Sequence, residues 1–314
     1  MSAVADVSLQ AEVLERLAVQ GEALGPLLGG AWTRLAARLR LGEREPGYFL
    51  HPLAFPILQL PAWAAERAGG AFPGGLTLDV CEAAAAGYLH VRVQDDRMDE
   101  GIGEGAATEL LSDTLLTRHQ RLLAGVVGGR AAFWDRFEVT WRAYAEAMLR
   151  ERALHDGEGT YDSEAFDAVM DRSRPLALPP AAIWIRAGLD ALLPALDEYV
   201  SSLSISHQLF TDLIDAERDL AAGNLTWVVR RMGITSADAG LPGALGRLRR
   251  ALYLEGGFDR IMKEAVAGLD RAAAAAARMG LPPASDAYLE RRRALMAASQ
   301  RQVFQALFDR LRGP

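Results

Sequence analysis

Cysteine is almost absent from the 314-residue sequence, which contains only Cys81. A single cysteine excludes a disulfide framework and a thiolate metal site within one chain. Long apolar runs are missing too, since no segment approaches the ~20 charge-free residues that a membrane span requires. The N-terminal stretch lacks the basic and apolar regions of a signal peptide. We therefore expect a cytoplasmic protein without a membrane span.

The sequence also has little that favours strands or a nucleic-acid partner. The formal net charge is -7, and the acidic side chains are interleaved with arginine, so no basic face is indicated. Nearly every periodic segment has helical spacing, and alternating runs of strand length are missing. These patterns predict an all-α fold and a single domain over residues 1–314. The expected helices cover residues 6–26, 53–67, 76–100, 106–125, 130–152, 162–172, 176–191, 194–221, 242–253, 257–278 and 284–311.

The predicted helix over residues 76–100 ends in an acidic cluster. Its earlier part is apolar on nearly all sides, which is typical of a buried helix. Its last turns carry Asp95, Asp96, Asp99 and Glu100, where the helix dipole already places negative potential. Like charges four residues apart cost a further ~0.2 to 0.5 kcal/mol. Because local physics disfavours this arrangement, the cluster indicates a functional site.

A second acidic row follows the mostly apolar segment 199–210. Helical spacing places Thr211, Asp215 and Asp219 on one stripe, with Asp212 beside them. A single row of this kind is explained equally well by a functional site and by a solvated helix face. Two rows at the ends of apolar helices favour the functional site. Many carboxylates without His or Cys suit a hard cation such as Mg²⁺. Facing rows would repel each other unless metal ions and a diphosphate bridged them.

These clusters resemble the two aspartate-rich motifs of the class I isoprenoid superfamily, which comprises trans-prenyl diphosphate synthases and terpene cyclases. Residues 89–99 contain all three aspartates of the first motif. Residues 207–215 are similar to F-Q-x-x-D-D-x-x-D, with His207 in place of Phe and Thr211 in place of the first Asp. Arg172 begins a segment in the place of K-T-x-x-L, and Asn224 stands where Lys is usual. The resemblance covers residues 76–230.

One motif of the chain-elongating members is missing. Their early G-G-K-x-x-R-P segment binds isopentenyl diphosphate, whereas the corresponding residues 45–53 contain no Lys-Arg pair. Two diphosphates in one pocket need two sets of counter-charges. The resemblance therefore implies a terpene synthase, a cyclase that ionises one prenyl diphosphate and steers the carbocation in an apolar cavity. Candidates for the lining of this cavity are Gly87, Tyr88, Val91 and Phe210.

The resemblance also implies roles for particular residues. The cofactor would be Mg²⁺, as three ions bound with the diphosphate, and the protein would form a homodimer. Arg172 or Arg174 would pair with the departing diphosphate. The candidate catalytic residues are Asp95, Asp96, Asp99, Asp212 and Asp215; the metal ligands are Asp95, Asp99, Asp212, Asp215 and Asp219; the substrate-binding residues are Arg172, Arg174, Gln208, Asn224, Tyr88 and Val91.

Two alternatives stay open from the sequence. The first is a prenyl elongase whose second-substrate site uses other arginines, such as Arg34, Arg38, Arg40 or Arg44. The second is a non-catalytic helical subunit that partners an active homologue, because Thr211 replaces an expected aspartate. An iron carboxylate bundle is excluded, since no Glu-x-x-His pair is present.

Overall fold

The computed structural model describes residues 3–41, 47–51, 53–100, 105–155, 159–238 and 240–312, without the side chains of 3–6, 99, 100, 155 and 307–312. Within these ranges the chain forms helices and no strand. The α-helices are α1 (Ala3–Ala23), α2 (Pro26–Arg38), α3 (Gln59–Ala68), α4 (Thr77–Glu100), α5 (Ala106–Val127), α6 (Ala131–His155), α7 (Ser163–Val169), α8 (Leu178–Ala187), α9 (Leu193–Ala222), α10 (Trp227–Arg231), α11 (Ala244–Arg249), α12 (Gly257–Met279) and α13 (Pro283–Arg312). Shorter helical segments include η1 (Tyr48–Leu50) and η4 (Met170–Ala177).

The predicted all-α class is confirmed, and most predicted helices lie within a few residues of their expected bounds. Two helices were not predicted, α2 and α10. Helix α2 carries Gly29 and Gly30 in its first turns, and both weaken the helical pattern. Helix α10 has only five residues, which is too short for a periodicity to be recognised. Helix α3 begins at Gln59 and not at residue 53, because Pro56 lies in the segment before it.

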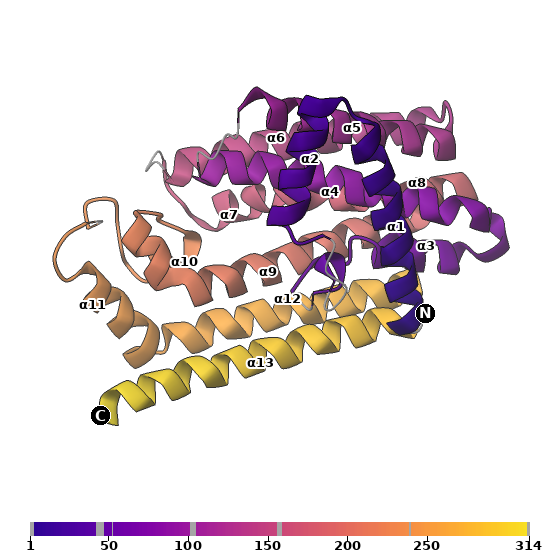
Figure 1. Cartoon of the computed structure of the whole chain (residues 1–314). Coiled ribbons are helices and arrows are strands. Elements are labelled where there is room, and N and C mark those ends of the chain that lie inside the picture. Colours follow the sequence, from indigo (N-terminus) through magenta and orange to yellow (C-terminus); the bar gives the residue numbers. More distant parts are fainter. Residues whose placement is uncertain are drawn as a thin grey trace.

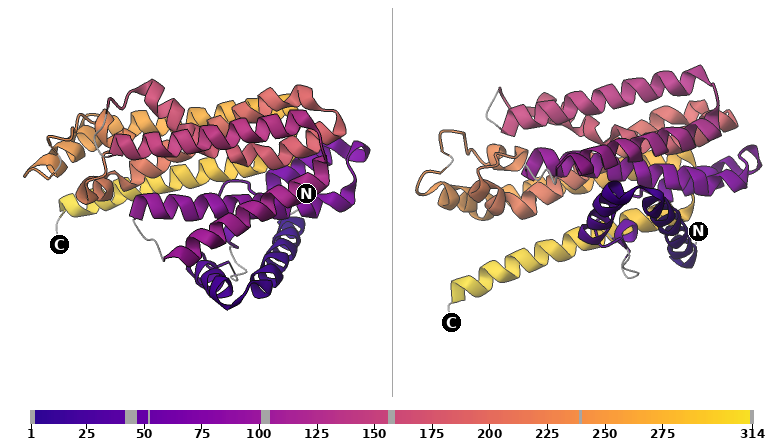
Figure 2. Two further views of the ribbon diagram at one scale, coloured as in Figure 1. Left: turned by 90° about the horizontal axis from the view of Figure 1, so that it is seen from above. Right: turned by 45° about the horizontal axis from the view of Figure 1, so that its top comes forward.

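The helices pack in two groups (Figure 1). Helices α9, α12 and α13 run along one side of the molecule, and α4, α5, α6 and α8 form the other. Helices α1 and α2 lie across the outside of α4 and α5, as the two further views also show (Figure 2). Within the described residues, no helix has the length and apolar character needed for a membrane crossing.

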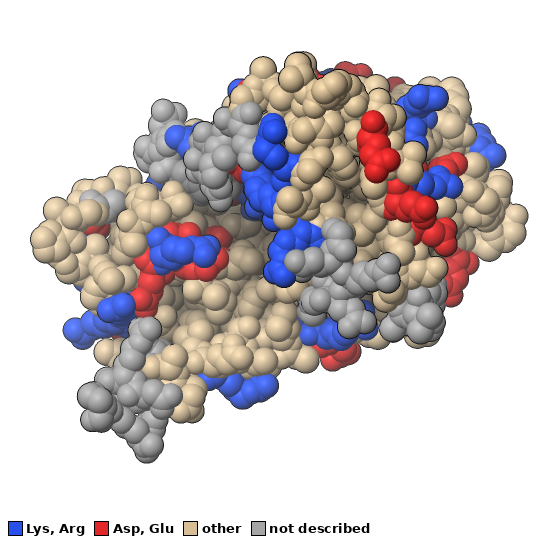
Figure 3. All heavy atoms as spheres, viewed as in Figure 1, with Lys and Arg blue, Asp and Glu red and all other residues tan. Residues whose placement is uncertain are grey.

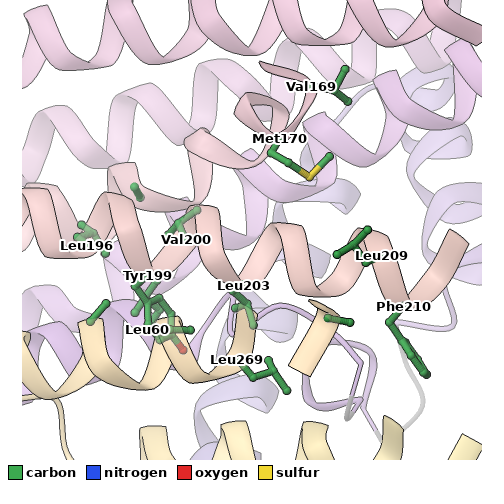
Figure 4. Close-up of a cluster of buried hydrophobic side chains, with 14 of the residues drawn as sticks. Leu60, Val169, Met170, Leu196, Tyr199, Val200, Leu203, Leu209, Phe210 and Leu269 are labelled. Atoms are coloured by element: carbon green, nitrogen blue, oxygen red, sulfur yellow. The ribbon is translucent and has the colours of Figure 1, made fainter. Parts of the chain in front are cut away.

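A large apolar core joins the two groups. Side chains from α9, α12, α3 and η4 meet in the cluster shown in Figure 4, including Leu203, Leu269, Leu60 and Met170. Gly268 of α12 permits close approach to α9, because a Cβ there would lie 2.9 Å from the Ser202 carbonyl oxygen. This packing fixes α9 in depth and rotation, and α9 carries the second acidic row.

Candidate active site

A cavity of about 620 Å³ lies between α4 and α9. Its other walls come from η4, from α6, from residues 38–40 at the end of α2 and from described residues between 48 and 57. Gly87, Tyr88 and Val91 line it, as predicted, whereas Phe210 points into the hydrophobic core and is only 2% exposed. The enclosed volume and mostly apolar inner wall suit a small-molecule ligand with a hydrocarbon portion.

Arg172 of η4 links the last turns of α4 to the middle of α9. Its guanidinium donates to Glu151 of α6 and to the side-chain oxygen of Gln208 on α9. It also lies 3.9 Å from the nearer carboxylate oxygen of Asp95 on α4. An arginine that contacts three helices at the cavity wall places a fixed positive charge between both motifs.

Asp212 is a buried carboxylate with one oxygen left unbonded. Gln208 donates to its Oδ1 at 2.6 Å, but its Oδ2 has no hydrogen-bond partner among the described residues. Burial raises the pKa of Asp212 well above its usual value, although Arg172 acts in the opposite direction. A buried oxygen without a partner is costly and indicates a missing cation or donor.

The other acidic residues of α9 lie nearer the surface. Asp215 pairs with Arg218 at 2.7 Å, one turn further along the helix. Burial, and then the charge of Asp215, raises the pKa of Asp219 to about 6. Both carboxylates follow Asp212 at helical spacing, so the row extends from a buried residue to two half-buried ones.

The donor set fits a hard cation such as Mg²⁺. All of the candidate ligands are carboxylates, and the unbonded Oδ2 of Asp212 is available to a metal. In the described part of the chain, no three His, Cys, Asp or Glu residues are close enough to hold a metal by themselves. The side chain of Asp99, another predicted ligand, lies outside the described residues. The remaining coordination positions are therefore ones that water or phosphate oxygens would fill.

Asp96, the middle aspartate of the first motif, has different partners. It is 5% exposed and lies 2.6 Å from Arg38 of α2 and 2.6 Å from Arg92 of α4. Both arginines line the cavity, so Asp96 holds two guanidinium groups at its wall. This contact also ties the end of α2 to α4.

Described residues of the region 45–53, which lacks a Lys-Arg pair, line the cavity. Tyr48 and His51 are among them, and the Tyr48 hydroxyl lies 3.4 Å from that of Tyr88. Arg40 lines the same wall and has a φ of 54°, a conformation that non-glycine residues rarely adopt. Basic side chains gather near the centre of this face, around the end of α2 (Figure 3).

Two predicted substrate-binding residues are not brought to the cavity. Arg174 pairs with Asp171 at 2.7 Å and is not among the lining residues. Asn224 is exposed just beyond the end of α9, where its backbone N–H donates to the Asp219 carbonyl oxygen. The roles proposed for these two residues remain predictions without a contact to the cavity.

Sequence reasoning missed two residues of α6 that belong to the site. Glu151 pairs with Arg172, and the buried hydroxyl of Tyr144 lines the cavity without a partner in the described structure. A signal was present, because Glu151 follows Tyr144, Ala147 and Met148 on one apolar helical stripe. A carboxylate on such a stripe needs a buried cation.

No family model matches the chain, and no curated protein matches its sequence significantly. Its structure is similar to several solved ones. The decaprenyl diphosphate synthase from Rhodobacter capsulatus has a TM-score of 0.70 and 15% identity over 95% of this chain and 97% of that one. A geranylgeranyl pyrophosphate synthase from Corynebacterium glutamicum, complexed with calcium and isoprenyl diphosphate, has a TM-score of 0.67 and 19% identity over 96% and 97%. The geranylgeranyl pyrophosphate synthetase from the archaeon Geoglobus acetivorans has a TM-score of 0.65 and 17% identity over 93% of this chain and 98% of that one. The chain therefore has the class I isoprenoid synthase fold.

Proposed function

We propose that the protein is a Mg²⁺-dependent prenyl diphosphate synthase that joins an allylic prenyl diphosphate to isopentenyl diphosphate. The observation that carries this proposal is the presence of two groups of charged residues at one cavity. One group consists of Asp95 and Arg172 in the cavity wall, with Asp212 held behind it by Gln208 of α9. The other group consists of Arg38, Arg40 and Arg92, and Arg92 also lies 3.5 Å from Asp95. Two diphosphates need two such groups.

The allylic diphosphate is assigned to the carboxylate side. Asp95, Asp99, Asp212, Asp215 and Asp219 are the candidate ligands of Mg²⁺, which supplies positive charge to the leaving diphosphate when it is bound. Arg172, held in place by Glu151 and Gln208, would bind the diphosphate oxygens as the C–O bond breaks. The apolar inner wall would then enclose the hydrocarbon chain and exclude water.

The isopentenyl diphosphate is assigned to the arginine side. The sequence argument for a cyclase was that cations for a second diphosphate are missing. Of the arginines that the alternative named, Arg38 and Arg40 line the cavity, together with Arg92. Arg34 does not line it, and Arg44 lies outside the described residues. The comparisons also support elongation better than cyclisation, because the similar structures named above are prenyl diphosphate synthases.

Cyclisation of a single substrate is the second candidate. It is favoured by the lack of a Lys-Arg pair in residues 45–53, where the Tyr48 hydroxyl instead contacts that of Tyr88. Asp96 also neutralises part of the charge of Arg38 and Arg92. With fewer free cations, the cavity would hold one diphosphate and a longer hydrocarbon chain.

A product assay separates the two candidates. Purified protein is incubated with Mg²⁺ and geranyl, farnesyl or geranylgeranyl diphosphate, with and without isopentenyl diphosphate, and extracts are analysed by mass spectrometry. Elongation predicts longer diphosphates only when isopentenyl diphosphate is present. A volatile product from one allylic substrate alone would establish a cyclase and reject elongation. The absence of product in every reaction would favour the non-catalytic subunit.

A matched pair of variants tests the second diphosphate site. We expect Arg40→Gln to raise KM for isopentenyl diphosphate roughly tenfold, because a charge-assisted hydrogen bond is lost. KM for the allylic substrate should change little. Arg34→Gln is the control, since Arg34 is exposed on the same stretch of chain and does not line the cavity. Equal KM values for isopentenyl diphosphate in both variants would show that Arg40 does not bind the second diphosphate.

A further inference from the structure

Arg292 of α13 is a buried cation behind the cavity wall. Its residue is 0% exposed, and within the described structure no carboxylate pairs with it. Its Nη1 donates to the carbonyl oxygens of Leu53 and Ala54 and to the Tyr288 hydroxyl, and its Nε has no partner among the described residues. Its Cζ also lies 6.0 Å from the centroid of the Phe55 ring and 5.7 Å from that of Tyr288. A buried cation that no described carboxylate neutralises is nevertheless costly, so this position calls for an explanation beyond packing.

The hydrogen bond from Arg292 fixes the tautomer of His207. Nη2 of Arg292 lies 3.0 Å from Nδ1 of His207. A guanidinium only donates hydrogen bonds, so Nδ1 must accept, and the proton of the neutral ring is on Nε2. Burial, and then Arg292 and Arg172, lower the pKa of His207 to about 3, which agrees with a neutral ring at physiological pH. His207 is therefore a donor at Nε2 and cannot act there as a base.

His207 is a residue of the cavity wall. His207 is half-buried and lines the cavity, and among the described residues Arg292 is its hydrogen-bond partner, at Nδ1 and not at Nε2. The ring is fixed from another side by Phe55, edge to face at 4.8 Å between centroids. His207 directly precedes Gln208, which contacts Arg172 and Asp212. His207 is thus on the same turn of α9 as the residue that contacts Arg172 and Asp212.

The charges around His207 indicate which kind of ligand atom its Nε2 donor would bind. Arg172 is surrounded by Glu151, Asp95 and Asp212, whereas Arg292 has no described carboxylate partner. A fixed donor in front of an unbalanced buried cation favours an anionic oxygen over a neutral one, because the low-dielectric surroundings strengthen the interaction.

From this geometry we infer that His207, held by Arg292, donates a hydrogen bond from Nε2 to a phosphate oxygen of a diphosphate bound in the cavity. The inference rests on the proposed function, since that function brings a diphosphate to this site. It adds a binding residue, His207, and a positioning residue, Arg292, in a place where the resemblance leads one to expect an apolar phenylalanine. The ligand class is an organic or inorganic diphosphate.

Two substitutions at position 207 distinguish the binding of diphosphate by Nε2 from the contact between Nδ1 and Arg292. In His207→Asn the side-chain oxygen replaces Nδ1 as the acceptor for Arg292, but the donor at Nε2 is lost. In His207→Gln the side-chain amide can reach the Nε2 position, but the acceptor for Arg292 is lost. Binding of inorganic diphosphate in the presence of Mg²⁺ is measured by calorimetry, and the unfolding temperature is measured for each variant.

We expect His207→Asn to unfold near the wild-type temperature and to bind diphosphate roughly tenfold more weakly. His207→Gln should unfold at a lower temperature and bind within a few-fold of the wild type. Wild-type affinity in His207→Asn would overturn the inference and leave the proposed function standing. If the wild type itself bound no diphosphate, both would fail.

A spectroscopic measurement tests the tautomer without any substitution. In ¹⁵N NMR of the histidine rings at pH 7, His207 is expected to carry its proton on Nε2, and added diphosphate should shift that resonance. A proton on Nδ1, or an Nε2 resonance that diphosphate leaves unchanged in a protein that binds it, would overturn the inference.

Discussion

Gly87 allows the imidazole of His119 to lie against the backbone of α4. A Cβ at position 87 would be 2.7 Å from Nδ1 of His119, which is itself buried and stacked on Phe137. We predict that Gly87→Ala lowers the free energy of unfolding by about 1 to 3 kcal/mol, because His119 has little room to shift. Urea denaturation measures this change.

The control for this substitution is Gly125→Ala. Gly125 is also a helical glycine, in α5, but nothing lies within 4 Å of a Cβ there. Alanine should therefore stabilise the protein by up to about 1 kcal/mol through its higher helix propensity. A loss of stability as large as that of Gly87→Ala would show that the His119 contact is not the cause.

Some residues of the site could be recognised in the sequence, and others could not. Asp95 and Asp212 were predictable because charges at the ends of apolar helices break a local rule. Arg38 and Arg40 were named only as an alternative, because nothing in their local sequence indicates that they line the cavity. Their position depends on how α2 packs against α5, and that is a long-range contact.

Glu82 connects three helices through a buried ion-pair network. Its side chain is fully buried and lies 2.6 Å from Arg118 of α5 and 3.3 Å from Arg16 of α1. We predict that Glu82→Gln lowers the free energy of unfolding by about 3 kcal/mol, because it leaves the Arg118 charge poorly compensated. Thermal and urea unfolding measure the loss.

The comparison for Glu82 is an exposed pair of similar chemistry. Glu138 and Arg142 lie 2.6 Å apart on α6, with most of both side chains in solvent. Glu138→Gln should change the free energy of unfolding by less than ~0.5 kcal/mol. If both substitutions had equal effects, the buried network would not be what holds α1 and α5 to α4.

Most helices of three turns or more could be predicted from periodicity, with α2 as the exception, whereas the cavity-lining residues between α2 and α3 could not. Residues 48–50 form the short helical segment η1, and His51 and residues 53–57, which lie outside the helices, also line the cavity. Their conformation is fixed from outside, by Tyr288 and Arg292 of α13 donating to the Ala54 carbonyl oxygen. Contacts across more than 200 residues of sequence leave no periodic signal along the chain.

At the scale of the whole molecule, metal and diphosphate should stabilise the fold together. Each carboxylate row needs cations, and the cations need phosphate oxygens to complete their coordination. We predict that Mg²⁺ with inorganic diphosphate raises Tm by several degrees, because saturation at 100 times Kd contributes about 2.7 kcal/mol. Differential scanning fluorimetry is the measurement.

Each component alone, and the Asp212→Asn variant with both, should give a much smaller rise in Tm. An equal rise with diphosphate alone would show that the arginines bind it without metal. The homodimer implied by the resemblance stays a prediction, which analytical ultracentrifugation at several protein concentrations would decide.

The backbone at Arg40 places stability and function in opposition. Its left-handed conformation costs about 1 to 3 kcal/mol for a residue with a Cβ. Glycine at this position would remove the strain and with it the guanidinium at the cavity wall. Selection for thermostability alone would therefore favour Arg40→Gly, and, if the proposed function holds, selection for use of isopentenyl diphosphate would oppose it. Position 40 is thus one where an engineered gain in robustness should come at the expense of turnover.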